Sequence, residues 1–171
     1  MLKLKAGFIA LVFVLGISNF AQAQFRFGGS LVASLPIGSL ADFTTIGLGL
    51  QAEGLYDLND NMSVGLSAGY TYLVEKNEFD GITYSIVPIT AYFNYHLKDT
   101  QSGLYFSGGL GAYTVTASFD SFGFASISST EIGLNLGAGV LLGKLNLTGK
   151  LHLIEDATYF GIGLGLLFGG E

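Results

Sequence analysis

Two histidines, His96 and His152, are the side chains of this chain best suited to acid–base catalysis near neutral pH. A histidine that activates a nucleophile normally works with a serine and a carboxylate within hydrogen-bond reach. Glu155 and Asp156 follow His152 closely, but no serine lies within two residues of either histidine. The sequence also contains no nucleophile elbow, phosphate-binding loop or metal-ligand spacing. We therefore expect both histidines to line the interior or the rim of the fold, with no enzymatic activity, cofactor or metal.

The composition excludes several other classes of function. A formal net charge of −6 over 171 residues provides no basic patch to neutralise the phosphates of a nucleic acid. The absence of cysteine excludes a thiolate nucleophile, a disulfide scaffold and a cysteine-based zinc site. Only 12% of the residues are charged, whereas 50% are hydrophobic and 26 are glycines. This composition is typical of a membrane or fibrous β-protein.

The first 23 residues have the three parts of a secretory signal peptide. A basic start with Lys3 and Lys5 is followed by an apolar run over 6–17 and by the cleavage-site tripeptide Ala21-Gln22-Ala23. The apolar run is shorter than the roughly 20 residues that a membrane-spanning helix needs. We predict a cleaved signal peptide over 1–23 and one domain over 24–171, with a retained signal anchor as the alternative.

Eight runs of alternating apolar and small or polar residues fill the remainder of the chain. Between residues 62 and 72, for example, Met, Val, Leu, Ala, Tyr and Tyr alternate with Ser, Gly, Ser, Gly and Thr. A period of two is the signature of a β-strand. The runs cover approximately 25–35, 46–56, 62–72, 83–97, 104–116, 132–142, 145–153 and 160–168. The fifth run is ambiguous, because Tyr105 and Tyr113 fall on the face opposite Leu104 and Phe106.

Strands of about 9–11 residues suffice to cross a bilayer when they are tilted. The eight runs therefore predict an all-β fold, an eight-stranded antiparallel up-and-down transmembrane β-barrel. Short connections at 57–61, 98–102 and 143–144 alternate with longer ones at 36–44, 75–82 and 118–126. Such alternation is typical of outer-membrane barrels, whose periplasmic turns are short and whose outer loops are longer.

Four charged residues within the runs, Arg26, Glu53, Glu131 and Lys150, share the small, polar face. A Lys or Arg that faces lipid at mid-depth costs about 2–4 kcal/mol, so we expect the polar face to line the lumen. Our hypothesis is that Lys150 forms an ion pair with Glu53 or Glu131 and closes the lumen to ions. A soluble barrel, the alternative, would need a polar exterior.

Two segments resemble a known family. Pro88-Ile89-Thr90-Ala91-Tyr92-Phe93-Asn94-Tyr95 resembles the Pro-then-aromatic strand of the small bacterial outer-membrane β-barrel domain family. Gly108-Gly109-Leu110-Gly111-Ala112-Tyr113 is similar to the glycine-rich strand that follows it there. The resemblance covers essentially 24–171 and extends to eight-stranded barrels of the OmpA/OmpX type, including the "porin family" of Bacteroidetes. One departure is that Phe168 is followed by Gly169-Gly170-Glu171, which would displace the terminal aromatic assembly signal.

The resemblance implies an exported protein of the cell outer membrane, with a structural or surface-interaction role. A narrow porin-like channel for ions or small solutes is the alternative, and a lipid-modifying enzyme is a more distant one. The expected partners are outer-membrane lipids, lipopolysaccharide and the barrel assembly machinery, and we expect a monomer. Aromatic residues in the outer loops are the expected contact points, namely Phe79, Phe119, Phe122 and Phe124.

Overall fold

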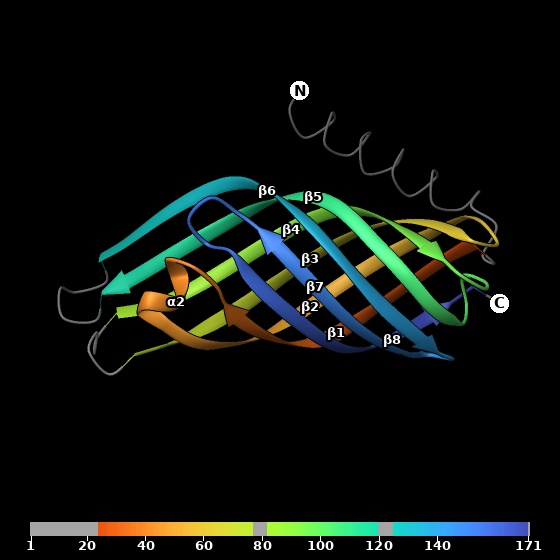
Figure 1. Cartoon of the computed structure of the whole chain (residues 1–171), viewed down its shortest axis with the longest axis horizontal. Helices are drawn as coiled ribbons and strands as arrows, with labels where there is room; N and C mark the ends of the chain where they lie inside the picture. Colours follow the sequence, from red (N-terminus) through yellow and green to blue (C-terminus); the bar gives the residue numbers. More distant parts are fainter. Residues whose placement is uncertain (1–23, 77–81, 120–124, 171) are drawn as a thin grey trace, which may run out of the picture.

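The structure is a computed structural model that describes residues 24–76, 82–119 and 125–170. Eight antiparallel strands follow one another around a closed barrel, in the order of the sequence (Figure 1). Closure occurs between the last strand and the first, where Leu164 pairs with Leu31. The predicted eight-stranded up-and-down barrel is therefore confirmed.

The strands are β1 (Phe25–Pro36), β2 (Thr44–Asn59), β3 (Met62–Glu75), β4 (Ile82–His96), β5 (Gly103–Phe119), β6 (Ala125–Leu142), β7 (Leu145–Leu153) and β8 (Tyr159–Gly169). One short helix that the sequence did not signal, α2 (Leu40–Phe43), lies between β1 and β2. In the described part of the chain, no helix is long and apolar enough to cross a membrane. The ambiguous fifth run is one continuous strand, whose tyrosines Tyr105 and Tyr113 are buried while Leu104 and Phe106 are exposed.

The two ends of the barrel differ. We name as the turn end the one where β1 begins, β8 finishes and the short connections 60–61, 97–102 and 143–144 lie. Gly143 adopts a φ of 62° in the two-residue turn 143–144, a left-handed conformation that favours glycine. The opposite, loop end carries the β1–β2 connection, which contains α2, and the β7–β8 connection. A 2.9 Å hydrogen bond from Ile37 N to Thr158 O joins these two connections.

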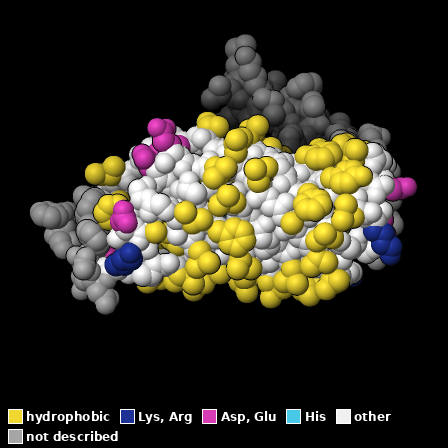
Figure 2. Space-filling view, in the orientation of Figure 1, with side chains coloured by type: hydrophobic (Ala, Val, Ile, Leu, Met, Phe, Trp, Pro, Cys, Tyr) yellow, Lys and Arg dark blue, Asp and Glu magenta, His cyan; other side chains and the backbone are white. Residues whose placement is uncertain are grey.

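The alternation along the strands separates an apolar exterior from a polar interior. Leu31, Leu66 and Ile132 on the outside are 63%, 67% and 75% exposed. Figure 2 shows hydrophobic side chains over the flank of the barrel and charged side chains near its two ends. This arrangement suits a barrel whose outer face meets lipid and not water.

The loop end is uneven in height. The β5–β6 pair continues as far as Phe119 and Ala125, whereas β7 ends at Leu153, opposite Leu134 of β6. The ends of β5 and β6 consequently extend beyond α2 and the β7–β8 connection (Figure 1). Residues 126–130 of β6 are exposed on both faces, whereas the facing end of β5 stays paired with β4 as far as Ile82, opposite Phe119.

Candidate functional site: the barrel lumen

The lumen is filled at its loop end by a buried apolar cluster. Its members come from β3, β4, β5, β8, α2 and the β7–β8 connection and are Leu40, Leu73, Ile86, Tyr113, Ile154, Ala157 and Tyr159. Tyr113 and Leu73 are fully buried. Because the loop segments before β2 and before β8 both contribute side chains, the cluster closes this end of the barrel from within.

A second apolar cluster lies nearer the turn end and consists of Leu55, Tyr92, Leu141 and Leu167. These four side chains come from β2, β4, β6 and β8, and none is more than 6% exposed. Since the four strands are spaced around the barrel, their side chains meet across its centre. The lumen is thus obstructed at two levels.

A network of polar side chains links the second apolar cluster to the middle of the lumen. The Tyr92 hydroxyl donates a 2.5 Å hydrogen bond to Oε2 of Glu53, and Nδ2 of Asn146 donates one of 3.3 Å to Oε1. Nζ of Lys150 lies 4.1 Å from the centre of the Tyr92 ring, a favourable position for a cation over a π-face. Tyr105 completes the group through a 2.8 Å hydrogen bond to Oδ1 of Asn146.

Glu53 and Lys150 both contact Tyr92, but they do not form an ion pair with each other. Among the described residues, Lys150 forms no ion pair with Glu53 or Glu131. Tyr92 separates the two charges, because it bonds Glu53 through its hydroxyl and meets Lys150 with its face. Glu131 lies elsewhere in the lumen, where its Oε2 is buried with no hydrogen-bond partner in the described part of the chain. The hypothesised lumen ion pair is therefore not the arrangement found.

Arg26, the remaining charge on the inward face, forms an ion pair of its own. Its Nη2 lies 2.7 Å from Oδ1 of Asp57, and the two side chains are only 3% and 9% exposed. The sequence predicts Asp57 in a turn, whereas the structure places it near the end of β2, where it is buried. A buried carboxylate beside a buried guanidinium is tolerable because each charge compensates the other.

Tyrosines occupy the space that the lumen glycines leave. A Cβ on Gly65 of β3 would lie 2.6 Å from Cζ of Tyr92, and one on Gly133 would lie 3.0 Å from Tyr113. Each ring therefore lies directly over a neighbouring strand that has no side chain at that point. The glycines permit tight packing of aromatic rings here.

The two histidines lie in separate parts of the lumen. Nδ1 of His152 forms a 2.9 Å hydrogen bond with the Tyr113 hydroxyl. The His152 ring also stacks on Tyr159, with ring centres 4.4 Å apart. His96, near the turn end, lies 3.4 Å from Oγ of Ser63. Within the described ranges, no three His or acidic side chains are grouped as a metal site requires. Each histidine is held by its neighbours as part of the packed interior.

The sequence of the chain matches the model of the outer membrane protein beta-barrel domain family over residues 7–168. The chain belongs to this family. The resemblance drawn from the Pro-then-aromatic and glycine-rich strands is confirmed, and membership implies a location in the outer membrane. A comparison with curated proteins gives no match.

Solved structures of similar fold include bacterial outer-membrane barrels. The attachment invasion locus protein Ail of Yersinia pestis aligns with a TM-score of 0.57 and 18% identity, over 85% of this chain and 97% of Ail. The N-terminal β-barrel domain of Pseudomonas aeruginosa OprF gives 0.54 and 18%, over 86% and 100% of the two chains. Neisserial surface protein A gives 0.54 and 17%, over 84% and 95%. At these identities the likeness shows the fold alone.

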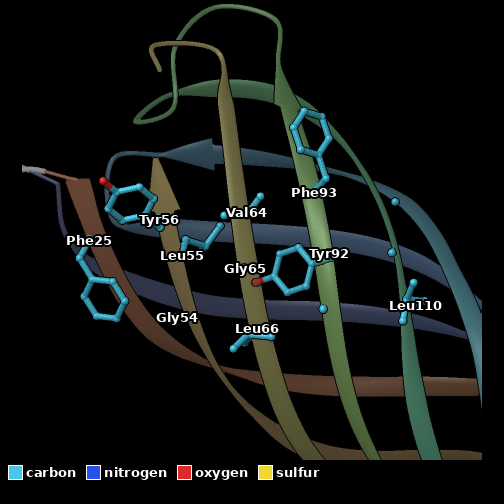
Figure 3. Close-up of a pocket in the computed structure, with 13 residues that line it drawn as sticks. Phe25, Gly54, Leu55, Tyr56, Val64, Gly65, Leu66, Tyr92, Phe93 and Leu110 are labelled. Atoms are coloured by element: carbon cyan, nitrogen blue, oxygen red, sulfur yellow. The ribbon is translucent and has the colours of Figure 1, made fainter. Parts of the chain in front are cut away.

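On the outer wall of this family member, the structure forms a shallow apolar hollow of about 590 Å³. Figure 3 shows Phe25 and Tyr56 at one side of the hollow and Phe93 and Leu110 at the other. Its floor is low because small residues, among them Gly54, face outward between these side chains. The lining is almost entirely apolar and lies on the lipid-facing side of the barrel, so the hollow suits the hydrocarbon chains of lipids.

The residues that sequence reasoning missed are the lumen aromatics and Asp57. Tyr92 could have been recognised, because it alternates with outward residues and falls on the same face as Asn94 and His96. An aromatic side chain on the polar face of a membrane strand signals a filled lumen. The predicted loop contacts Phe79, Phe122 and Phe124 lie outside the described residues, and of Phe119 only the backbone, at the end of β5, is described.

Proposed function

We propose that this protein is an outer-membrane barrel closed to solutes that acts at the cell surface through its loop end. The observation that carries the proposal is the β5–β6 extension. Its residues 126–130 are exposed on both faces, and Ile127 is 69% exposed. Polar strands with an exposed apolar side chain, presented on a rigid barrel, are suited to contact with another surface.

The proposed orientation follows the general rule that short turns face the periplasm and longer connections face outward. Residues 1–23 would be removed on export, and the barrel assembly machinery would insert the remaining chain as a monomer. Outer-membrane lipids would then surround the apolar wall, and lipopolysaccharide would surround the loop end. The aromatic loop residues Phe79, Phe119, Phe122 and Phe124 would add to the contact surface.

The filled lumen supports a barrel that does not conduct. Two apolar clusters obstruct it, and the interior of an eight-stranded barrel is only wide enough to be filled by side chains. A channel is the second candidate, because polar atoms such as Oδ1 of Asn94 and Oγ of Ser107 are buried with no hydrogen-bond partner among the described residues. Water at these atoms would be the first element of a conducting path.

An enzymatic role has less support. His152 is engaged with Tyr113 and Tyr159, and His96 lies at the other end of the lumen. No serine or carboxylate is in hydrogen-bond contact with His152 among the described residues. We therefore propose a non-enzymatic protein.

The first test is single-channel conductance of the protein purified from outer membranes, in a planar lipid bilayer. The proposal predicts a silent bilayer although the protein is inserted and folded, as judged by heat-modifiable migration in a detergent gel. Steady, ion-selective current steps would contradict the closed barrel and favour the channel.

The second test shortens the β5–β6 extension and keeps the pairing of β5 with β4 up to Thr116, which lies opposite Ser85. Thr116 and Ser128 are direct partners, so residues 117–127 can be replaced by Asn-Gly, which closes a two-residue hairpin turn. Cells lacking their own copy are complemented with the wild type, the trimmed barrel or a control carrying Glu155→Gln in the β7–β8 connection. We expect the trimmed barrel to restore outer-membrane resistance to detergent but not attachment between cells. Attachment equal to that of the wild type would leave only a structural role.

A further inference from the structure

A small cavity of about 180 Å³ lies at the turn end of the barrel. Its polar lining comes from Arg26 of β1, Gln101 of the β4–β5 connection and Lys144 of the β6–β7 turn. Leu141 and Leu167, which belong to the second apolar cluster, form its apolar side. The cavity therefore stands between that cluster and the medium beyond the turns, and nothing in the proposed function uses it.

Arg26, one of the residues that line this cavity, has hydrogen-bond donors for which the described residues supply no acceptor. The residue is 2% exposed, and its Nη2 donates to Asp57. No protein group within the described ranges accepts a hydrogen bond from its Nε or Nη1, although both atoms are buried. A buried donor that lacks an acceptor is costly, and the cost is larger for a charged group. The guanidinium therefore favours an acceptor that enters the cavity.

Neighbouring groups hold Arg26 in place without supplying that acceptor. Gln101 donates its side-chain N–H to the carbonyl of Gly170, whose backbone follows β8. A Cβ on Gly170 would lie 2.9 Å from Cγ and Cδ of Arg26, so the chain packs against the aliphatic part of the side chain. The stem of Arg26 is thus fixed, which lowers the entropy lost when its head binds a ligand.

The charges around the cavity favour an anion. Arg26 and Asp57 compensate each other, and Lys144 adds a further positive charge at the cavity wall. His96 faces the same end from β4, and Lys98 and Asp99 lie on the connection that carries Gln101. The side chain of Asp99 is engaged by Ser102 and by the backbone N–H of Gln101. The charges that line the cavity itself are therefore Arg26 and Lys144, both positive.

We propose that this cavity binds a phosphate-class oxyanion between Arg26 and Lys144. A tetrahedral phosphate presents acceptor oxygens in several directions and can engage both cations at once, and charge-assisted hydrogen bonds of this kind are strong. The cavity has room for such a group but not for a large ligand. Free phosphate and the phosphate of a phospholipid headgroup are the two sources of this chemistry.

The test uses a feature of the sequence, which is that Arg26 is its only arginine. The side-chain Nε–H of ¹⁵N-labelled protein therefore gives one assigned arginine signal in an NMR spectrum. The protein is purified from outer membranes in a non-ionic detergent and titrated with sodium phosphate, with sodium chloride of equal ionic strength as the control. We expect the signal to move and saturate with phosphate and not with chloride.

A matched pair of lysine variants tests the second cation. We expect Lys144→Gln to weaken phosphate binding about two- to fivefold, which is the effect of losing one solvent-exposed ion pair. Lys98→Gln removes a charge from the neighbouring connection, outside the cavity lining, and should leave binding unchanged. A signal that ignores phosphate, follows chloride equally, or responds alike in both variants would overturn the proposal.

Two further arms separate the sources of the anion. In phospholipid nanodiscs without free phosphate, a signal already at its phosphate-bound position identifies the headgroup, and a signal that moves only on titration identifies free phosphate. Both results support the site.

Glu171→Gln tests whether a carboxylate of the chain itself is the acceptor. If this variant shifts the Arg26 signal while phosphate leaves the wild type unchanged, the proposed ligand is wrong. Phosphate-dependent resistance to heat, compared between the two lysine variants, gives an independent readout of the same site.

Discussion

The Tyr92 hydroxyl donates a 2.5 Å hydrogen bond to the Glu53 carboxylate although a whole strand, β3, separates their two strands. Tyr92 pairs directly with Gly65 of β3, and its ring passes over this glycine to reach β2. Figure 3 shows the ring beside Gly65 with its oxygen directed across β3. One missing side chain therefore permits a polar contact between strands that are not neighbours.

Replacing Tyr92 with Phe should destabilise the barrel by about 1–3 kcal/mol, because a partly buried carboxylate loses its shortest hydrogen bond. The ring that Lys150 contacts remains, so the variant isolates the hydroxyl. The free energy of unfolding in detergent micelles, measured with guanidinium chloride, checks the prediction. Tyr70→Phe is the control, since Tyr70 is 52% exposed on the outer face. Equal losses in the two variants would contradict a special role for the lumen hydroxyl.

Gly65→Ala should also destabilise the barrel, by about 1–3 kcal/mol, because the new methyl group would overpack the Tyr92 ring. Gly29→Ala on β1 is the matched control, since the nearest atom to its Cβ would be 3.5 Å away. The cost of Gly65→Ala should fall sharply in a Tyr92→Ala background, where the ring is absent. If the cost stays the same in that background, the clash is with the backbone and our explanation fails.

The Arg26–Asp57 ion pair should show strong coupling in a double-mutant cycle. Arg26→Met leaves the Asp57 carboxylate buried without its cation, which should cost about 3–5 kcal/mol. Removing both charges, with Arg26→Met and Asp57→Leu together, should cost clearly less than the sum of the single variants. Asp60→Asn, on the adjacent turn, controls for a general effect of charge. Strictly additive losses would show that the two side chains do not stabilise each other.

The strands and their faces could be predicted because alternation is a local property. The sequence around Met62–Tyr72 contains all the information needed to assign β3 and to direct Val64 and Leu66 outward. Charged residues on the face that carries small and polar side chains indicate that this face points into the lumen. The same local pattern cannot identify α2, since four residues are too few for a helical period to show.

The contacts within the lumen could not be predicted, because they depend on strand register and closure. Arg26 and Asp57 are 31 residues apart, and they meet only once β1 is aligned with β2 so that Arg26 lies opposite Leu55. Lys150 reaches Tyr92 across the barrel, a contact that no pair of adjacent strands defines. The alternation of residues along each strand predicts which side chains point into the lumen, but it does not predict which of these side chains contact one another.

The free edge of β6 should be visible in amide hydrogen exchange. Residues 134–142 of β6 have β5 on one side and β7 on the other, whereas residues 125–133 are paired with β5 alone. Successive residues of an antiparallel strand direct their N–H groups to opposite sides. We therefore expect about half of the amides over 126–132 to exchange rapidly, in an alternating pattern, and nearly all of those over 134–142 to be protected.

The stretch of β5 opposite to it, residues 112–118, is paired with β4 on one side and β6 on the other and serves as the protected control. NMR or mass spectrometry of the protein in detergent gives the exchange rates. Uniform protection over 126–132 would mean that another segment covers this edge, and the β5–β6 extension would then lack the open strand. If the alternating pattern is present in detergent but lost on intact cells, a component of the cell surface pairs with β6, as a surface-interaction role requires.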